Sequence, residues 1–149
     1  MSKFFDRYKT DRGAEEEGVW VDFGDGIRVK LRRLNSAKSK EVRRRLEKPF
    51  EKQYRNGREY PDSLQEELMN KQLAQAIVVD WEGIPELDQS GSPIDGKDMP
   101  CTPENVIRMV SQFPDFREEI TTASLERATF QVEERKEREG NSEAVSNGN

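Results

Sequence analysis

Apolar and polar residues alternate over two stretches near the start of the chain, from Val19 to Phe23 and from Ile27 to Leu31. Gly24-Asp25-Gly26 separates the two stretches. A period of two on both sides of a glycine-rich turn is typical of a β-hairpin. One face of this hairpin is apolar and the other is polar. We therefore expect a helix to cover the apolar face.

The spacing of apolar residues then changes to one typical of a helix. Ser36 can cap a helix whose apolar residues recur every four positions and could lie on the hairpin: Val42, Leu46, Phe50 and Tyr54. Pro49 predicts a kink or break near Glu47, because proline removes a backbone donor and clashes with the preceding turn. We expect the helix to end by Asn56-Gly57. Its acids and bases Glu41 and Arg45, and Glu51 and Arg55, are spaced for ion pairs.

A second helix is predicted from the capping box that Ser63 and Glu66 can form. We expect Asp80-Trp81-Glu82-Gly83 to end this helix, with the glycine in the left-handed conformation. Ile84-Pro85 prevents its continuation. Within the ending motif, Trp81 is predicted to be a core anchor.

The segment from Ile84 to Cys101 is rich in Gly, Pro, Asp and Ser and is predicted to be a loop. It could contain a tight hairpin at Ser90-Gly91 or at Asp95-Gly96.

Two further helices are predicted after this loop. Thr102 can cap the first, with Pro103 at its first position, and Pro114 closes it. Asp115 can cap a longer final helix that runs to about Val132.

These elements predict a mainly helical α+β domain, with an N-terminal β-hairpin packed against about four helices. We divide the chain into a mobile N-terminal arm (1–17), a single domain (18–136) and a disordered C-terminal tail (137–149). The arm contains Phe4, Phe5 and Tyr8, whose role no motif explains.

Charge is distributed unevenly along the 149 residues. The net charge is −5, yet the stretch from Arg28 to Arg58 holds 13 Lys and Arg against three acids. Such polarity can attract an oppositely charged partner or another copy of the chain, so self-association is possible.

The composition argues against an enzyme and against a metal or cofactor site. The chain has no histidine, the usual general base and the commonest zinc ligand, and Cys101 is its single cysteine. The acids between Asp80 and Asp98 do not have the spacing of a calcium-binding loop. No apolar run is long enough for a signal peptide or a membrane span, so we expect a soluble protein of the cytoplasm.

The candidate partner-binding residues lie in two places. Trp20 is on the polar face of the hairpin, where another segment could cover it or a partner could bind it. The other candidates are cations of the basic helix 38–58: Lys40, Arg44, Lys48 and Arg55. That helix could be a solvated face, a protein-binding surface or a nucleic-acid-binding surface.

Several motifs in this order resemble the tail assembly chaperones of long-tailed bacteriophages. The resemblance spans residues 18–134, from the hairpin GVWVDFGDGIRVKL and the basic helix to Asp80-Trp81-Glu82-Gly83 and the helix start CTPENVIRMV. It implies a protein that binds the tape-measure protein, keeps it soluble, and promotes polymerisation of the tail tube around it. It also implies a protein of the host cytoplasm that is absent from the finished virion.

In this family a programmed frameshift often yields a longer form that contacts the tail-tube protein. The alternative function is a small nucleic-acid-binding regulator that uses the basic helix.

Overall fold

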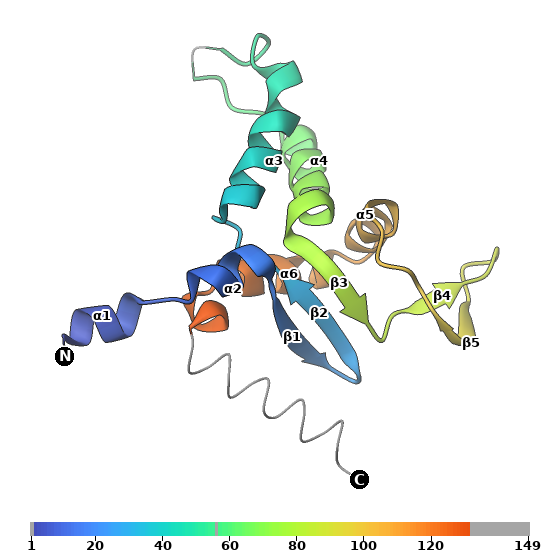
Figure 1. Cartoon of the computed structure of the whole chain (residues 1–149). Coiled ribbons are helices and arrows are strands. Elements are labelled where there is room, and N and C mark those ends of the chain that lie inside the picture. Colours follow the sequence, from blue (N-terminus) through green and yellow to red (C-terminus); the bar gives the residue numbers. More distant parts are fainter. Residues whose placement is uncertain (1, 56, 132–149) are drawn as a thin grey trace.

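A three-stranded antiparallel sheet lies at the centre of the protein in a computed structural model that describes residues 2–55 and 57–131 (Figure 1). Its strands, in the order β1-β2-β3, are Val19–Gly24, Ile27–Leu31 and Val78–Glu82. Two helices project together from one side of this sheet, and a second, two-stranded sheet lies beyond β3 (Figure 1). The predicted class, α+β and mainly helical, is confirmed.

The predicted first hairpin is confirmed. β1 pairs with β2 from Val19 opposite Leu31 to Gly24 opposite Ile27. At its turn Asp25 and Gly26 have φ values of 54° and 80°. Positive φ at both central residues gives a turn whose twist matches that of the strands.

The prediction that Asp80-Trp81-Glu82-Gly83 ends a helix is wrong. Helix α4 (Asp62–Gln72) continues as one π-helical segment, Leu73–Ile77, and the chain then enters β3. The β-branched pair Val78 and Val79 favours a strand, and β2 supplies the backbone partners for it. Gly83 does have a left-handed φ of 82°, but it follows a strand.

Trp81 is a core residue, as predicted, and only 6% of it is exposed. Its indole Nε1 donates a hydrogen bond to the carbonyl of Met99 at 2.8 Å. Because a buried indole N–H needs an acceptor, this bond joins β3 to the segment that leads into the next helix.

Helix α3 (Ala37–Glu47) begins at the predicted cap and breaks near Glu47 as predicted, but the expected continuation towards Asn56-Gly57 is wrong, because residues 51–54 form turns. The hydroxyl of Ser36 accepts from the backbone N–H of Ser39, and the α-helix stops before Pro49, in a single 3-10 turn (Lys48–Phe50).

The prediction that this helix lies on the hairpin is wrong, because it packs against α4. Between the two helices, the buried amide of Gln72 donates to the hydroxyl of Ser39 at 2.8 Å. Strand β3 occupies the edge of β2 that would otherwise be free, so the hairpin is extended by a strand.

The predicted capping box of α4 is also wrong. The helix starts at Asp62 with Pro61 at its N-cap and no side-chain cap. Glu66 instead accepts a charge-assisted hydrogen bond from Arg117 at 2.5 Å. Its carboxylate therefore points to another helix and not to its own N-terminus.

The loop after β3 does contain a hairpin, made of β4 (Pro85–Leu87) and β5 (Pro93–Asp98). Its turn lies at Ser90-Gly91, one of the two predicted places. Asp88 Oδ1 accepts from the backbone N–H groups of Ser90 and Ser92. These hydrogen bonds, with that from the Ser90 hydroxyl the largest cause, lower the pKa of Asp88.

Helix α5 (Pro103–Gln112) has the predicted cap, with the Thr102 hydroxyl accepting from Asn105 N–H at 3.2 Å. The prediction that Asp115 caps the next helix is wrong. Helix α6 (Pro114–Leu125) has Phe113 at its N-cap and Pro114 at its first position. Proline suits that position because no N–H partner is needed there.

A 3-10 turn (Arg127–Phe130) follows α6. The predicted helix end near Val132 and the predicted tail, 137–149, lie outside the described residues.

The N-terminal segment contains two short helices that the sequence did not predict, α1 (Lys3–Tyr8) and α2 (Arg12–Glu17). Helix α2 is anchored through Ala14, which forms a small buried cluster with Val19 and Phe130. No residue of α1 is buried. The division into arm, domain and tail stays a prediction.

We predict that Gly83→Ala destabilises the fold strongly. A Cβ at this position would collide with the carbonyl oxygen of Gly26, and φ is 82°. The left-handed strain and the overpacking together would lower the free energy of unfolding by about 2–5 kcal/mol. Urea denaturation measures the change.

Gly91→Ala is the matched control, because φ is 86° there and no atom lies within 4 Å of the added Cβ. It should cost only about 1–2 kcal/mol, the strain alone. Equal losses in the two variants would contradict the close approach of the two backbones.

Candidate protein-binding surfaces

An apolar groove lies where the β4–β5 hairpin meets the corner between α5 and α6. It has a volume of about 570 Å³, and most of the surface exposed in it is apolar. We define the groove by its lining residues: Ile27, Gly83, Ile84, Pro85, Leu87, Gly91, Pro93, Met109, Gln112, Phe113, Asp115, Phe116 and Glu119.

One wall of the groove is the α5–α6 corner. Helix α5 ends at Gln112 and α6 begins at Pro114, so Phe113 is the single residue between them. The residue before a proline is kept out of helical conformation, and its φ and ψ are −123° and 86°. The side chain of Phe113 is 49% exposed.

The opposite wall comes from the second hairpin, in which Leu87 pairs with Pro93. Ile84 is 9% exposed and belongs to the main core. The ring of Phe116 lies 6.4 Å from that of Phe23, edge to face, which holds it against β1. Two lining residues of the groove, Ile84 and Met109, are buried in the main core, so the groove is attached to the core of the domain.

The charged residues that line the groove are acidic. Among its described lining residues are Asp115 and Glu119 and no Lys or Arg. Arg117 lies between these two acids in the sequence, but its guanidinium pairs with Glu66 on α4. The groove thus suits an apolar segment with basic neighbours.

The four cations predicted to bind a partner all lie on one projection. We call residues 37–55, α3 and the turns that follow it, the basic arm, and Figure 1 shows it projecting from the sheet beside α4. Lys40, Arg44, Lys48 and Arg55 are all exposed. The first three are four residues apart, so they follow one side of the helix.

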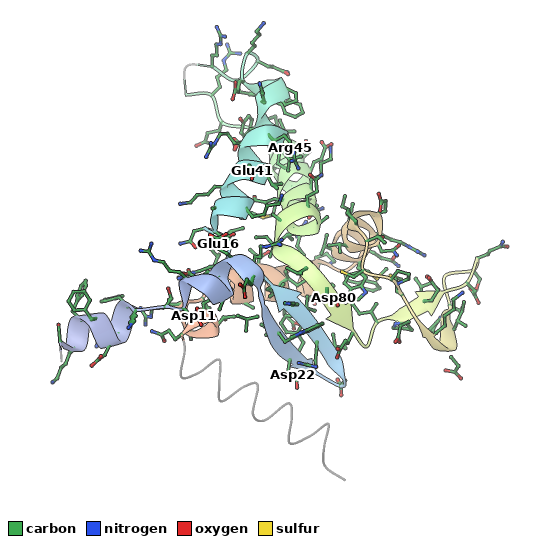
Figure 2. All side chains as sticks on the ribbon, viewed as in Figure 1. Asp11, Glu16, Asp22, Glu41, Arg45 and Asp80 are labelled. Atoms are coloured by element: carbon green, nitrogen blue, oxygen red, sulfur yellow. The ribbon has the colours of Figure 1, made fainter. Side chains whose placement is uncertain are left out.

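Other cations of the basic arm have partners within the protein. Arg43 forms an ion pair with Glu47 at 3.0 Å. Arg45, labelled with Glu41 in Figure 2, donates to the amide oxygen of Gln75 at 2.7 Å rather than to the predicted partner Glu41. Part of the positive charge therefore supports the packing of α3 against the π-helical segment that continues α4.

Trp20 does not join these cations. It lies on β1, opposite Lys30, and is half-buried. The guanidinium of Arg28 lies 4.9 Å from the centre of its ring, and Arg28 also pairs with Glu82 at 3.1 Å. The polar face of the sheet is thus covered at Trp20 by a cation–π contact.

The sequence did not predict the groove. Phe113 was expected within the helix that Pro114 closes, and Ile84-Pro85 at the start of a loop. The sequence signal that could have indicated it is Phe113-Pro114. The residue before a proline is kept out of helical conformation, so a large apolar side chain is left at the corner between two helices.

In the part of the chain that the structure describes, no group of three or more acidic or cysteine side chains could hold a metal ion. None of the described helices is both long and apolar enough to cross a membrane.

The Cys101 thiol is predicted to react slowly with iodoacetamide. Burial, with a smaller effect from the Asp80 carboxylate, raises its pKa from 9 to about 11. Because only the thiolate reacts, the folded protein should react roughly 100-fold more slowly at pH 8 than the protein in urea.

Asp80→Asn should speed this reaction by only a few-fold, since burial is the larger cause. Asparagine can keep the hydrogen bond that Asp80 Oδ1 accepts from Trp81 N–H. Equal rates in folded and unfolded protein would contradict the half-buried position of the thiol.

Comparison with known proteins gives one result. No curated protein and no solved structure matches the chain. A model of the YdaY prophage protein family matches residues 34–141. This match confirms the phage origin that the resemblance implied, while its description mentions no tail function. Since the match covers well over half of the 149 residues, the chain belongs to the YdaY prophage protein family.

Proposed function

We propose that this prophage protein is a tail assembly chaperone that binds the tape-measure protein and keeps it soluble while the tail tube polymerises. The observation that supports this proposal best is the apolar groove with its acidic residues and exposed Phe113. Exposed apolar surface bordered by polar residues marks a protein-binding site. A tape-measure protein is a long helical chain that must be protected before the tube surrounds it.

The groove suits the apolar face of an amphipathic helix. Such helices bind in grooves through side chains spaced three to four residues apart. Asp115 and Glu119 favour basic residues beside those anchors. Several copies would cover successive apolar segments of the tape measure.

Release is as important as binding in this mechanism. A groove of about 570 Å³ covers only a short segment of a client, so affinity per copy is modest, and polymerising tube subunits can displace the protein. The charged outer faces keep the complex soluble. The protein then stays in the host cytoplasm and is absent from the virion, and a longer frameshifted form would contact the tail-tube protein.

A second candidate function, nucleic-acid binding, rests on the four exposed cations of the basic arm. Cations along one side of a helix can neutralise phosphates. The net charge of −5 acts against it. The dependence of binding affinity on salt concentration distinguishes the two functions. Affinity through phosphate contacts falls steeply as salt rises, while affinity through apolar contacts does not.

We predict that coexpression with the tape-measure protein encoded by the same prophage keeps that protein soluble, and that Phe113→Asp abolishes most of the effect. A charge in the groove opposes burial of an apolar helix face. The measurement is the soluble fraction of tape-measure protein after centrifugation.

Leu125→Asp is the matched control, since Leu125 is 53% exposed and does not line the groove. It should protect as well as the unaltered protein. Tape-measure protein that is equally insoluble with and without the unaltered chain would refute the proposed function.

A further inference from the structure

The large apolar side chains that remain exposed in the described residues fall mainly into two groups. Phe113 belongs to the groove, and a second group lies on α1: Phe4 at 62%, Phe5 at 67% and Tyr8 at 50% exposed. The remaining one is Leu125. Exposed aromatic residues on a helix with no buried residue indicate a missing partner.

The aromatic residues of α1 form a preassembled cluster. The ring of Phe4 lies 5.6 Å from that of Phe5 and 4.9 Å from that of Tyr8. Arg127 lies over the Tyr8 ring at 5.0 Å. Gln131 donates to the carbonyl of Arg7 at 2.7 Å. These contacts hold α1 in place beside the end of the described chain.

Helix α1 cannot fill the groove of its own molecule. Figure 1 shows α1 on one side of the central sheet and the β4–β5 hairpin on the other. The connection to α2 is short, and the N–H of Asp11 is bonded to the Phe130 carbonyl at 2.8 Å. Any groove that receives α1 therefore belongs to another molecule.

The two surfaces are complementary in charge as well as in polarity. The cluster is accompanied by the cations Lys3, Arg7 and Lys9, whereas the described residues that line the groove include two acids and no Lys or Arg. One acid, Asp6, lies on α1. Opposite charges at the edge of an apolar contact favour encounter and orientation.

We propose that α1 of one copy docks in the groove of a second copy. The occupant presents its aromatic cluster to Phe113 and the second hairpin, and its cations lie near Asp115 and Glu119. The contact joins two different surfaces, so a pair of copies still has one free groove and one free α1. Contacts of this kind extend into chains or close into rings.

The interface would be small. An aromatic side chain buries about 150–250 Å², so three of them supply less area than a stable dimer needs on each side, about 800 Å². Association should therefore be weak and depend on concentration. A client helix with apolar and basic residues, if the proposed function holds, would displace α1 from the same groove.

Sedimentation velocity of the purified full-length protein over a range of concentrations tests the proposal. The unaltered chain should form dimers and longer species as concentration rises. Phe4→Asp with Phe5→Asp removes the occupant, and Phe113→Asp alters the groove, so each variant alone should remain monomeric. An equal mixture should form dimers and nothing larger, because only one functional α1–groove pair remains.

A chain that is monomeric at every concentration would refute the proposal, as would a mixture of folded variants that does not dimerise. Association of a folded variant to the same extent as the unaltered chain would refute it too. Circular dichroism verifies folding. If Phe113→Asp does not fold, Asp115→Lys with Glu119→Lys tests the same contact by repelling α1, and should weaken association about tenfold or more.

The test uses no phage partner, so its failure is separate from failure of the chaperone function. The variant with Phe4→Asp and Phe5→Asp keeps its groove. It should still protect the tape-measure protein if the chaperone function is right.

Discussion

The close approach of Gly83 to the carbonyl of Gly26 determines how β3 ends against the turn of the first hairpin. Ile27 follows that turn and Ile84 follows Gly83, so one backbone contact places two residues of the groove. The N–H of Met99 donates to the carbonyl of Ile84 at 2.8 Å, and Trp81 donates to the carbonyl of Met99. The second hairpin is thereby held between the sheet and α5, and the groove depends on this arrangement.

Local signals in the sequence predicted local structure well. The glycine turn of the first hairpin, the Ser36 and Thr102 caps and the break before Pro49 each depend on residues within a few positions. The transition after α4 was mispredicted because apolar residues with helical spacing, among them Leu73 and Ile77, lead without a break into Val78. Only pairing with β2, about 50 residues earlier in the sequence, makes the following residues a strand.

In the candidate surfaces, too, the features that depend on neighbouring residues were predictable and those that depend on distant residues were not. The charge asymmetry is a property of the sequence, and the structure places most of its exposed cations on the basic arm. The sequence could not show that Trp20 is covered within the protein, because Arg28 lies over its ring only when β1 and β2 are paired. The groove could not be predicted either, because its lining residues come from separate segments between Ile27 and Glu119 that share no periodic pattern.

A protein that protects an apolar client must itself avoid aggregation when no client is present. An exposed groove and an exposed aromatic cluster on one molecule would each favour non-specific association. If the two surfaces bind each other between copies, both are covered by a contact small enough to reverse. Under the proposed chaperone function, client binding would replace one weak apolar contact with another, so the free energy of exchange would stay small in both directions. The proposed coating of a long partner and its release to the tail tube need that balance.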